Sequence, residues 1–141
     1  MKALIQISVS LFLCTAGLPV VAQETAIDCA NAQNQNEMNT CAQDDFDRAD
    51  KELNRVYKQA MAAAVKLDEE SLESDPDNII AAKSLKKAQR AWIDYRDGHC
   101  DGYGQLAGGG SMQPLLIFGC KTKVTEARVK ELKELIEGLG K

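Results

Sequence analysis

The sequence has very little of what most catalytic and metal sites are built from. It contains a single histidine, His99, among 141 residues. Nucleophilic hydrolysis needs a base beside the nucleophile, and a catalytic zinc takes three protein ligands that usually include histidine. Ser111 is the one serine in a plausible loop, and no sequence signature joins it to His99. The sequence therefore predicts no catalytic residue, no metal site and no cofactor, in a protein that is not an enzyme.

Aromatic residues are scarce as well, at 5 % of the chain with one tryptophan. Alternating strand patterns are almost absent, whereas apolar residues recur at helical spacing. A small helical domain with so few large side chains has limited apolar area to bury, and covalent links often support such a domain. We therefore expect an all-α fold that depends partly on disulfides.

The first 22 residues are typical of a secretory signal peptide. Met1-Lys2 is a minimal basic start, residues 3–18 carry no charge, and residues 20–22 offer a small-residue cleavage site. The apolar run is short for a transmembrane anchor. A lipoprotein would need small residues before Cys14, where Phe12-Leu13 stand. We expect cleavage near Ala22, loss of Cys14 with the leader, and a periplasmic or secreted protein.

Cleavage there leaves one domain, residues 23–141, with 16 basic and 21 acidic side chains and a net charge of −5. Mild acidity disfavours nucleic acid and anionic membrane surfaces as partners, and it is compatible with a basic partner. We therefore expect no nucleic acid, no membrane after cleavage, and a monomer.

Four cysteines remain in that domain: Cys29, Cys41, Cys100 and Cys120. An even number in an exported chain indicates disulfides. The alternative is a four-thiolate zinc site, but such sites usually use two closely spaced CxxC pairs, and here the gaps are 12, 59 and 20 residues. Four cysteines allow three connectivities, which spacing alone does not decide.

One apolar stripe predicts a long first helix over residues 34–68. Asn34 can cap it, and Glu37 stands where a capping box needs its carboxylate. No proline or glycine interrupts the segment, and charged residues occupy its other face. A helix of this length would span about 50 Å. The stripe consists of Met38, Ala42, Phe46, Ala49, Leu53, Val56, Ala60, Ala64 and Leu67.

A second helix is predicted to begin at Asp75-Pro76, a capping aspartate followed by a proline suited to the first helical position. Its stripe runs through Leu85, Ala88, Trp92 and Tyr95, with Trp92 in the core, and we expect it to end near Gly98. The linker over residues 68–78 is short, so the two helices should form an antiparallel hairpin.

Residues 101–119 are predicted to form a loop, because Gly102, Gly104, the run 108–110 and Pro114 are typical loop residues. Residues 115–118 are its apolar patch and should tuck back onto the core. The part over 102–114 has two interpretations: a binding loop stapled at its base, or a plain spacer that reverses the chain. The glycine run lacks the lysine and the preceding strand of a phosphate-binding loop.

A third helix completes the fold, which we predict to be a small disulfide-stapled helical bundle, a long antiparallel hairpin plus a C-terminal helix. Thr122 or Thr125 can cap this helix, and Gly138 and Gly140 can end it. Its apolar side consists of Val129, Leu132, Leu135, Ile136 and Leu139.

In this arrangement all four cysteines gather at one end of the bundle. A Cys100–Cys120 bridge would close the glycine loop, and a Cys29–Cys41 bridge would pin the N-terminal arm to the first helix. We favour this pairing over the other two.

Paired carboxylates offer the only other chemistry. Asp94 and Asp97 lie at helical spacing, with Arg90 and Arg96 close by. A salt-bridged helix face is the simpler interpretation, and we favour it over an acid–base site.

Several segments together resemble the LprI-type lysozyme inhibitor family. The resemblance covers nearly the whole mature chain, from about Cys29 to Leu135, and the ordered combination of four cysteines with these motifs is specific. The matching residues are Cys29, the run 37–42, Ala49-Asp50, Leu53-Asn54, Tyr57, the run 88–97, Cys100, Gly110-Ser111, Cys120, Thr125 and Arg128.

The resemblance implies an exported protein of the bacterial envelope that binds lysozyme and blocks hydrolysis of the cell-wall glycan. Lysozymes cleave glycan with two carboxylates in a groove, which an inserted loop could block. The cystine end of the bundle offers five candidate contacts: His99, Tyr103, Gln105, Ser111 and Gln113. The alternative function is an envelope protein-interaction module that does not affect lysozyme.

Overall fold

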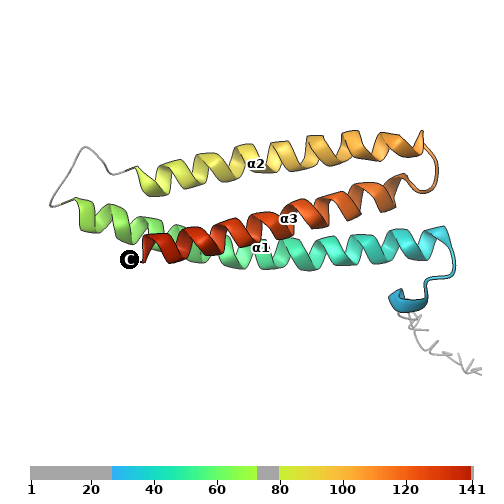
Figure 1. The fold of residues 1–141 in the computed structure, drawn as a ribbon, viewed down its shortest axis with the longest axis horizontal. Helices are drawn as coiled ribbons and strands as arrows, with labels where there is room; N and C mark the ends of the chain where they lie inside the picture. The colour runs from blue at the N-terminus through green and yellow to red at the C-terminus, as the bar shows by residue number, and fades with distance from the viewer. Residues whose placement is uncertain (1–26, 73–79, 141) are drawn as a thin grey trace, which may run out of the picture.

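The structure is a computed structural model that describes residues 27–72 and 80–140, and it is all-helical in those ranges, as predicted. The expected signal peptide, its cleavage site, Cys14 and Asp75-Pro76 lie outside the described residues. Figure 1 shows α1 and α2 running antiparallel, with α3 returning alongside them. The elements are η1 (Cys29–Asn31), α1 (Gln35–Ser71), α2 (Ala81–Gly104), η3 (Gln105–Ala107) and α3 (Gln113–Leu139).

The long first helix is confirmed, and α1 extends over 37 residues. At about 1.5 Å per residue it is roughly 55 Å long. Its start is the predicted cap: the Asn34 side chain accepts a hydrogen bond from the Glu37 N–H at 3.0 Å, and the Glu37 carboxylate accepts from the Gln33 N–H at 2.6 Å. The helix therefore begins where local sequence alone places it.

The start of α2 differs from the prediction. The described helix begins at Ala81, whereas the predicted start at Asp75-Pro76 lies outside the described residues, and Ile80 at the N-cap position provides no side-chain cap. The carboxylate of Asp68, from the last turns of α1, instead accepts hydrogen bonds from the N–H groups of Ala81 and Ala82 at 2.8 and 3.0 Å. Tertiary contact between two helix ends thus replaces a local cap.

The end of α2 is also a correction, because the helix continues past Gly98 to Gly104. Gly104 allows close packing on α3: a Cβ atom there would lie 2.4 Å from Ile117 Cγ1. Only residues 108–112 form the turn between η3 and α3, and Gly108 and Gly109 adopt φ of 57° and 79°, a region that favours glycine. Most of the predicted loop is therefore helix, because tertiary packing outweighs the low helix propensity of glycine.

The third helix starts earlier than predicted, at Gln113, with Pro114 in its first turn. A proline is favourable there because its missing N–H would have no partner within the helix. Thr122 and Thr125 consequently lie inside α3, and so do residues 115–118. At the other end Gly140 follows the helix as its C-cap, as expected, whereas Gly138 is still helical.

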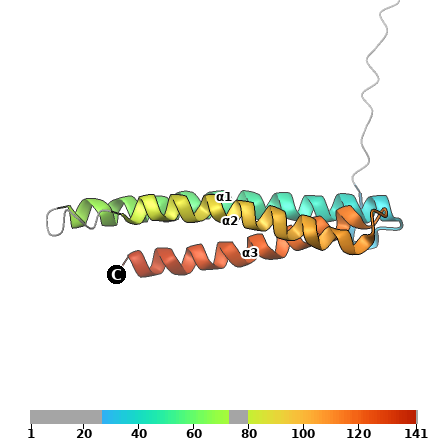
Figure 2. The same cartoon turned by 90° about the horizontal axis from the view of Figure 1, so that it is seen from above.

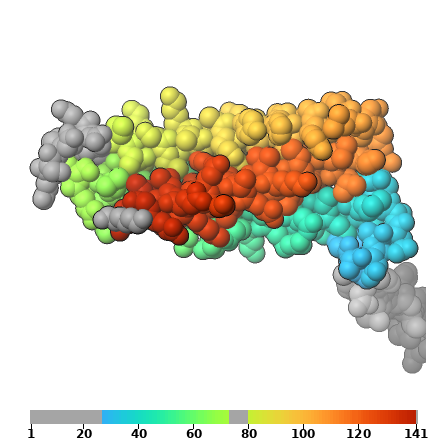
Figure 3. All heavy atoms as spheres, in the orientation of Figure 1, coloured from blue at the N-terminus to red at the C-terminus, as the bar shows by residue number. Residues whose placement is uncertain are grey.

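The core lies along the seam where α3 covers α1 and α2 (Figure 3). Leu53, Val56 and Leu132 are at most 2 % exposed, and the half-buried Trp92 packs against this cluster. Ala60 and Ala64 are just as deeply buried, and their small side chains let α1 lie close to its neighbours. Figure 2 shows α3 beside the α1–α2 pair and converging on it where α2 joins α3. Within the described ranges no helix is both long and apolar enough to span a membrane.

Candidate functional site

The two disulfides are Cys29–Cys41 and Cys100–Cys120, the pairing favoured from the sequence. Cys41 lies early in α1, Cys100 late in α2 and Cys120 early in α3, so all four cysteines gather at one end of the bundle. We call this part, residues 27–48 and 92–124, the cystine end. It brings together the start of α1, the end of α2 and the start of α3.

All five candidate contact residues lie at the cystine end, but they do not form one loop. His99 and Tyr103 lie on the last turns of α2, and Gln105 follows in η3. Ser111 lies in the 108–112 turn, and Gln113 is the first residue of α3 and is half-buried. The structure thus places two of them on a helix face and three around the connection between α2 and α3.

His99 and Tyr103 face a groove between α2 and α3. It has a volume of about 330 Å³, and its α3 side is formed by Leu115, Leu116, Gly119, Cys120, Lys123 and Val124. We call it the α2–α3 groove. The ring of His99 stacks on that of Tyr95, with centroids 5.3 Å apart and planes at 14°. This stack lies on the α2 side of the groove.

Several large apolar side chains are exposed at the cystine end, and one of them, Tyr103, lines the groove. Tyr95 is 57 % exposed and Tyr103 47 %. Leu106, in η3, is 73 % exposed, and Met112, just before α3, is 46 % exposed. A cluster of exposed apolar groups often marks an interaction surface. This groove was not predicted from the sequence, although Tyr95, His99 and Tyr103 recur every four residues and so lie along one side of a helix.

Charge at the cystine end is mainly acidic. It carries eight acidic side chains, among them Asp44, Asp47, Asp94 and Asp101, against four basic ones. Of the four cations, Arg96 is buried and Lys121 is paired with Asp97 and Asp101. This end therefore presents a negative surface in which Lys123, at the groove, has no acidic partner among the described residues.

Arg96 holds the helices together beneath this surface. It is 8 % exposed, and its guanidinium lies 5.1 Å from the ring centroid of Phe46 and 5.2 Å from that of Trp92. It donates hydrogen bonds to Asp50 and Asp97, each at 2.9 Å. The exposed salt-bridged face predicted from the sequence is therefore wrong in part, since Arg96 is buried and Asp94 and Arg90 have no ion-pair partner in the described part of the chain.

Two carboxylates, Asp97 and Glu52, have pKa values shifted away from those of a general acid that works near neutral pH. Burial alone would raise the pKa of Asp97, but hydrogen bonds and charge from Arg96 and Lys121 outweigh it and lower that pKa below its ordinary value. Hydrogen bonds from Arg55 and Lys133 lower the pKa of Glu52 from 4.5 to about 2. A general acid needs the opposite shift, toward the working pH.

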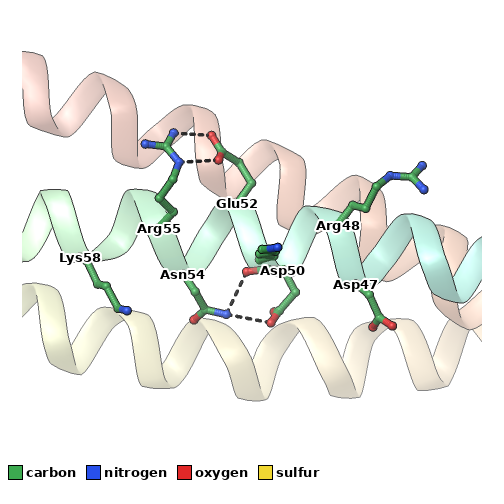
Figure 4. A pocket seen from close by; sticks show the side chains of 8 residues that line it. Asp47, Arg48, Asp50, Glu52, Asn54, Arg55 and Lys58 are labelled. Carbon is green, nitrogen blue, oxygen red and sulfur yellow. Dashed lines mark hydrogen bonds and ion pairs between the residues drawn. The ribbon is translucent and has the colours of Figure 1, made fainter.

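A larger hollow, of about 690 Å³, runs along α1 and is lined by α1 residues alone (Figure 4). Several of its polar side chains pair with protein groups: Arg55 with Glu52 and Asn54 with Asp50 within α1, while Glu52 also pairs with Lys133 of α3 and Asp50 with Arg96 of α2. One helix cannot enclose a ligand, so this hollow is an ordinary solvated helix face. The described residues also contain no cluster of three or more histidine, cysteine or carboxylate groups that could hold a metal ion.

The first half of α2 carries a separate, basic surface. Lys83, Lys86, Lys87 and Arg90 are all exposed and have no acidic partner in the ranges that the structure describes. The charges of the chain are thus divided between an acidic cystine end and a basic face farther along α2, a division that the net charge conceals.

Comparison with known proteins agrees with these features. The family described as lysozyme inhibitor LprI matches residues 28–132. A protein of Rhizobium meliloti (strain 1021), which is named as uncharacterized, is 45 % identical over 130 residues, covering 92 % of this chain and 93 % of its own. No solved structure matches the chain significantly. The matched range includes both disulfides and all three long helices up to Leu132, and the chain therefore belongs to the LprI lysozyme inhibitor family.

Proposed function

We propose that this protein binds lysozyme in the bacterial envelope or outside the cell and blocks hydrolysis of the cell-wall glycan. Its membership of the LprI family carries this proposal. The acidic cystine end, with its exposed tyrosines, supplies a surface for a basic partner. Tyrosine is among the residues most enriched at the centres of protein interfaces.

The tip of the cystine end has the hydrogen-bond donors that such a function requires. Ser111 is held in place through its carbonyl, which accepts a hydrogen bond from the Asn39 side chain of α1 at 2.9 Å. The N–H groups of Gly109 and Ser111 donate no hydrogen bond within the described residues. A lysozyme groove contains two carboxylates, which are hydrogen-bond acceptors when ionised. The 108–112 turn can donate to them from a preorganised backbone.

Rigidity of the turn favours tight binding. The Cys100–Cys120 disulfide closes the segment that contains the 108–112 turn. Helical structure flanks this turn on both sides, since η3 leads into it from α2 and α3 follows it. A preorganised loop loses little conformational entropy on binding. A tip built in this way can fill a groove and keep the glycan out.

The direct test is a cell-wall clearing assay with the oxidised mature chain, residues 23–141, titrated against chicken-type and goose-type lysozymes. Inhibition that saturates near one inhibitor per enzyme is the expected result for at least one type. A folded, fully oxidised sample that inhibits neither type contradicts the proposal.

Two substitutions locate the contact. Replacing Ser111 and His99 together by alanine should weaken inhibition tenfold or more, because both side chains are exposed at the cystine end. Lys66→Ala, at an exposed position far along α1, is the matched control and should leave inhibition unchanged. Unchanged inhibition by the double variant would place the contact elsewhere.

A second candidate function is an envelope interaction module that does not affect lysozyme. The basic face of α2 favours it, since four cations there have no acidic partner among the described residues, suit an acidic partner and would repel a basic one. Loss of partner capture after Lys83→Glu and Lys87→Glu, in a protein that inhibits no lysozyme, would support this alternative.

A further inference from the structure

Gly119 occupies a position in α3 where packing does not require a glycine. It lies well inside the helix, and a Cβ atom added to it would meet nothing within 4 Å. Glycine destabilises a helix interior relative to alanine, because it has more backbone freedom to lose. Gly119 therefore lowers the stability of the helix, and packing gives no reason for a glycine at this position.

Three other glycines of the cystine end have structural reasons, whereas Gly98 and Gly102, like Gly119, would accept a Cβ with no contact within 4 Å but do not line the α2–α3 groove. Gly104 lies too close to Ile117 for a side chain, and Gly108 and Gly109 adopt positive φ. Gly119 has neither reason. What it does have is a place in the α2–α3 groove, where its missing side chain leaves space between Tyr103 and the α3 side chains.

The groove has the form of a receptor for one side chain. Its volume of about 330 Å³ lies at the lower end of the range of small-molecule sites, about 300–1,000 Å³. Leu115, Leu116 and Val124 provide apolar contacts, and His99 and Tyr103 provide flat aromatic surfaces. Lys123 adds a charged donor that has no acidic partner in the described residues. A projecting apolar side chain with an acceptor group beside it fits this combination.

We propose that the α2–α3 groove is the anchor pocket of the inhibitor and takes one projecting aromatic or aliphatic side chain from the lysozyme surface. This proposal rests on the proposed function. Charge complementarity of the whole cystine end identifies the partner, because its eight acidic side chains against four basic ones attract a basic protein, although no acidic residue lines the groove itself. Anchors that fill a pocket near the centre of an interface commonly carry most of the binding energy.

The two contacts have different shapes. The 108–112 turn is a convex tip that can enter the catalytic groove of the enzyme, whereas the α2–α3 groove is concave and can receive a residue from the rim of that groove. Leu115 and Leu116 follow the turn by only a few residues, so tip and groove share one connected surface. The turn would then contact the inside of the lysozyme cleft, and the groove would contact a residue on its rim.

Filling the groove tests the proposal, because the change affects stability and binding in opposite directions. Gly119→Ala should raise the melting temperature, since alanine is the better helix former, and should weaken lysozyme binding. Gly119→Leu should weaken binding tenfold or more, measured as the dissociation constant by calorimetric titration with the full oxidised mature chain.

Gly138→Ala and Gly138→Leu are the matched controls. Gly138 lies in the same helix at the far end, and a Cβ atom added there also meets nothing within 4 Å. Both controls should bind lysozyme as the unchanged protein does. Tyr103→Ala removes one wall of the groove without adding volume to α3, and it should also weaken binding tenfold or more, so the test does not depend on the folding of Gly119→Leu.

The binding results distinguish a failure of the proposed function from a failure of the groove proposal. If the unchanged protein does not bind lysozyme, the proposed function fails and the anchor pocket fails with it. If the unchanged protein binds and both Gly119→Leu and Tyr103→Ala bind equally well, the function stands and the groove proposal is overturned. If the Gly138 controls lose binding to the same extent, the effect is not specific to the groove and the proposal is overturned as well.

Discussion

At the scale of single residues, Arg96 shows how one side chain can join two helices, α1 and α2, and share a carboxylate with a third. Its guanidinium stacks near the rings of Phe46 in α1 and Trp92 in α2 and pairs with Asp50 and Asp97. Lys121 of α3 reaches the same Asp97 at 3.3 Å. Because arginine combines a planar face with several donors, it can satisfy rings and carboxylates at once, which lysine cannot.

We expect Arg96→Ala to lower the free energy of unfolding by about 2–3 kcal/mol, less than for a fully buried pair because Asp50 and Asp97 remain partly exposed. Arg96→Lys keeps the charge but loses the ring contacts, and it should recover only part of that loss. Urea unfolding followed by circular dichroism measures both. A loss below about 0.5 kcal/mol for Arg96→Ala, within the range of ordinary surface changes, would show that the cluster contributes little.

The lowered pKa values of Glu52 and Asp97 predict how the stability of the fold changes at acidic pH. Hydrogen bonds from Arg55 and Lys133 lower the pKa of Glu52 from 4.5 to about 2 in the folded protein, and the pKa of Asp97 is also lowered. A carboxyl group with a lower folded pKa stabilises the fold above its unfolded pKa, and this contribution is lost as the pH falls.

The urea midpoint should therefore decrease as the pH falls from about 5 to 2. Glu52→Gln removes one of the contributing groups, so its profile should be flatter in this window. Because Glu52 is solvent-accessible, added salt should reduce the difference between the two proteins. Identical profiles would mean that the contacts with Arg55 and Lys133 do not persist in solution.

At the scale of elements, contacts between helices set two helix ends that local signals do not. Asp68 of α1 caps α2 across the hairpin, and the packing of Gly104 on Ile117 extends α2 to the turn. The Cys100–Cys120 disulfide lies between these features and the start of α3. It therefore reinforces a connection that the glycines would otherwise leave flexible.

Removing that disulfide by Cys100→Ser and Cys120→Ser should lower the free energy of unfolding by about 3 kcal/mol, the usual value for a loop of this length. Cys29→Ser with Cys41→Ser is the comparison, since Cys29 lies in an exposed arm whose release leaves the three helices packed. The second pair should cost less in a thermal melt. Equal losses would show that the arm contributes as much as the α2–α3 connection.

At the scale of the whole molecule, the chain is a rod with unlike charges along its length. The cystine end is acidic, and the first half of α2 is basic. A basic partner is attracted to one part of the surface and repelled from the other, which orients an encounter before contact. Net charge alone suggests only mild acidity.

Lysozyme inhibition should weaken as salt increases, because exposed charges are screened within about 10 Å at 0.1 M ionic strength. The inhibition constant is measured between about 20 and about 300 mM salt, where screening changes strongly. The slope of its logarithm against the logarithm of the salt concentration reports the electrostatic contribution. Asp94→Asn with Asp101→Asn should reduce that slope, and Lys83→Gln with Lys87→Gln should not. A slope unaffected by the aspartate changes would exclude steering by the cystine end.

The sequence alone was enough to predict the features that depend on local order and composition. It predicted the all-α fold and the first helix with its Asn34–Glu37 cap, because periodicity and caps act over a few residues. It also placed the cysteines at one end and favoured the observed pairing, since a short hairpin linker leaves few ways to bring those elements together.

Contacts between the helices set the end of α2, the start of α3 and the surface that the cystine end presents. Residues 101–107 and 113–119 have loop-like composition, yet they are helical because packing between α2 and α3 and a disulfide outweigh the cost of their glycines. The burial of Arg96 and the α2–α3 groove arise from residues far apart in the chain. Contacts of that kind depend on how the helices pack, which no local pattern records.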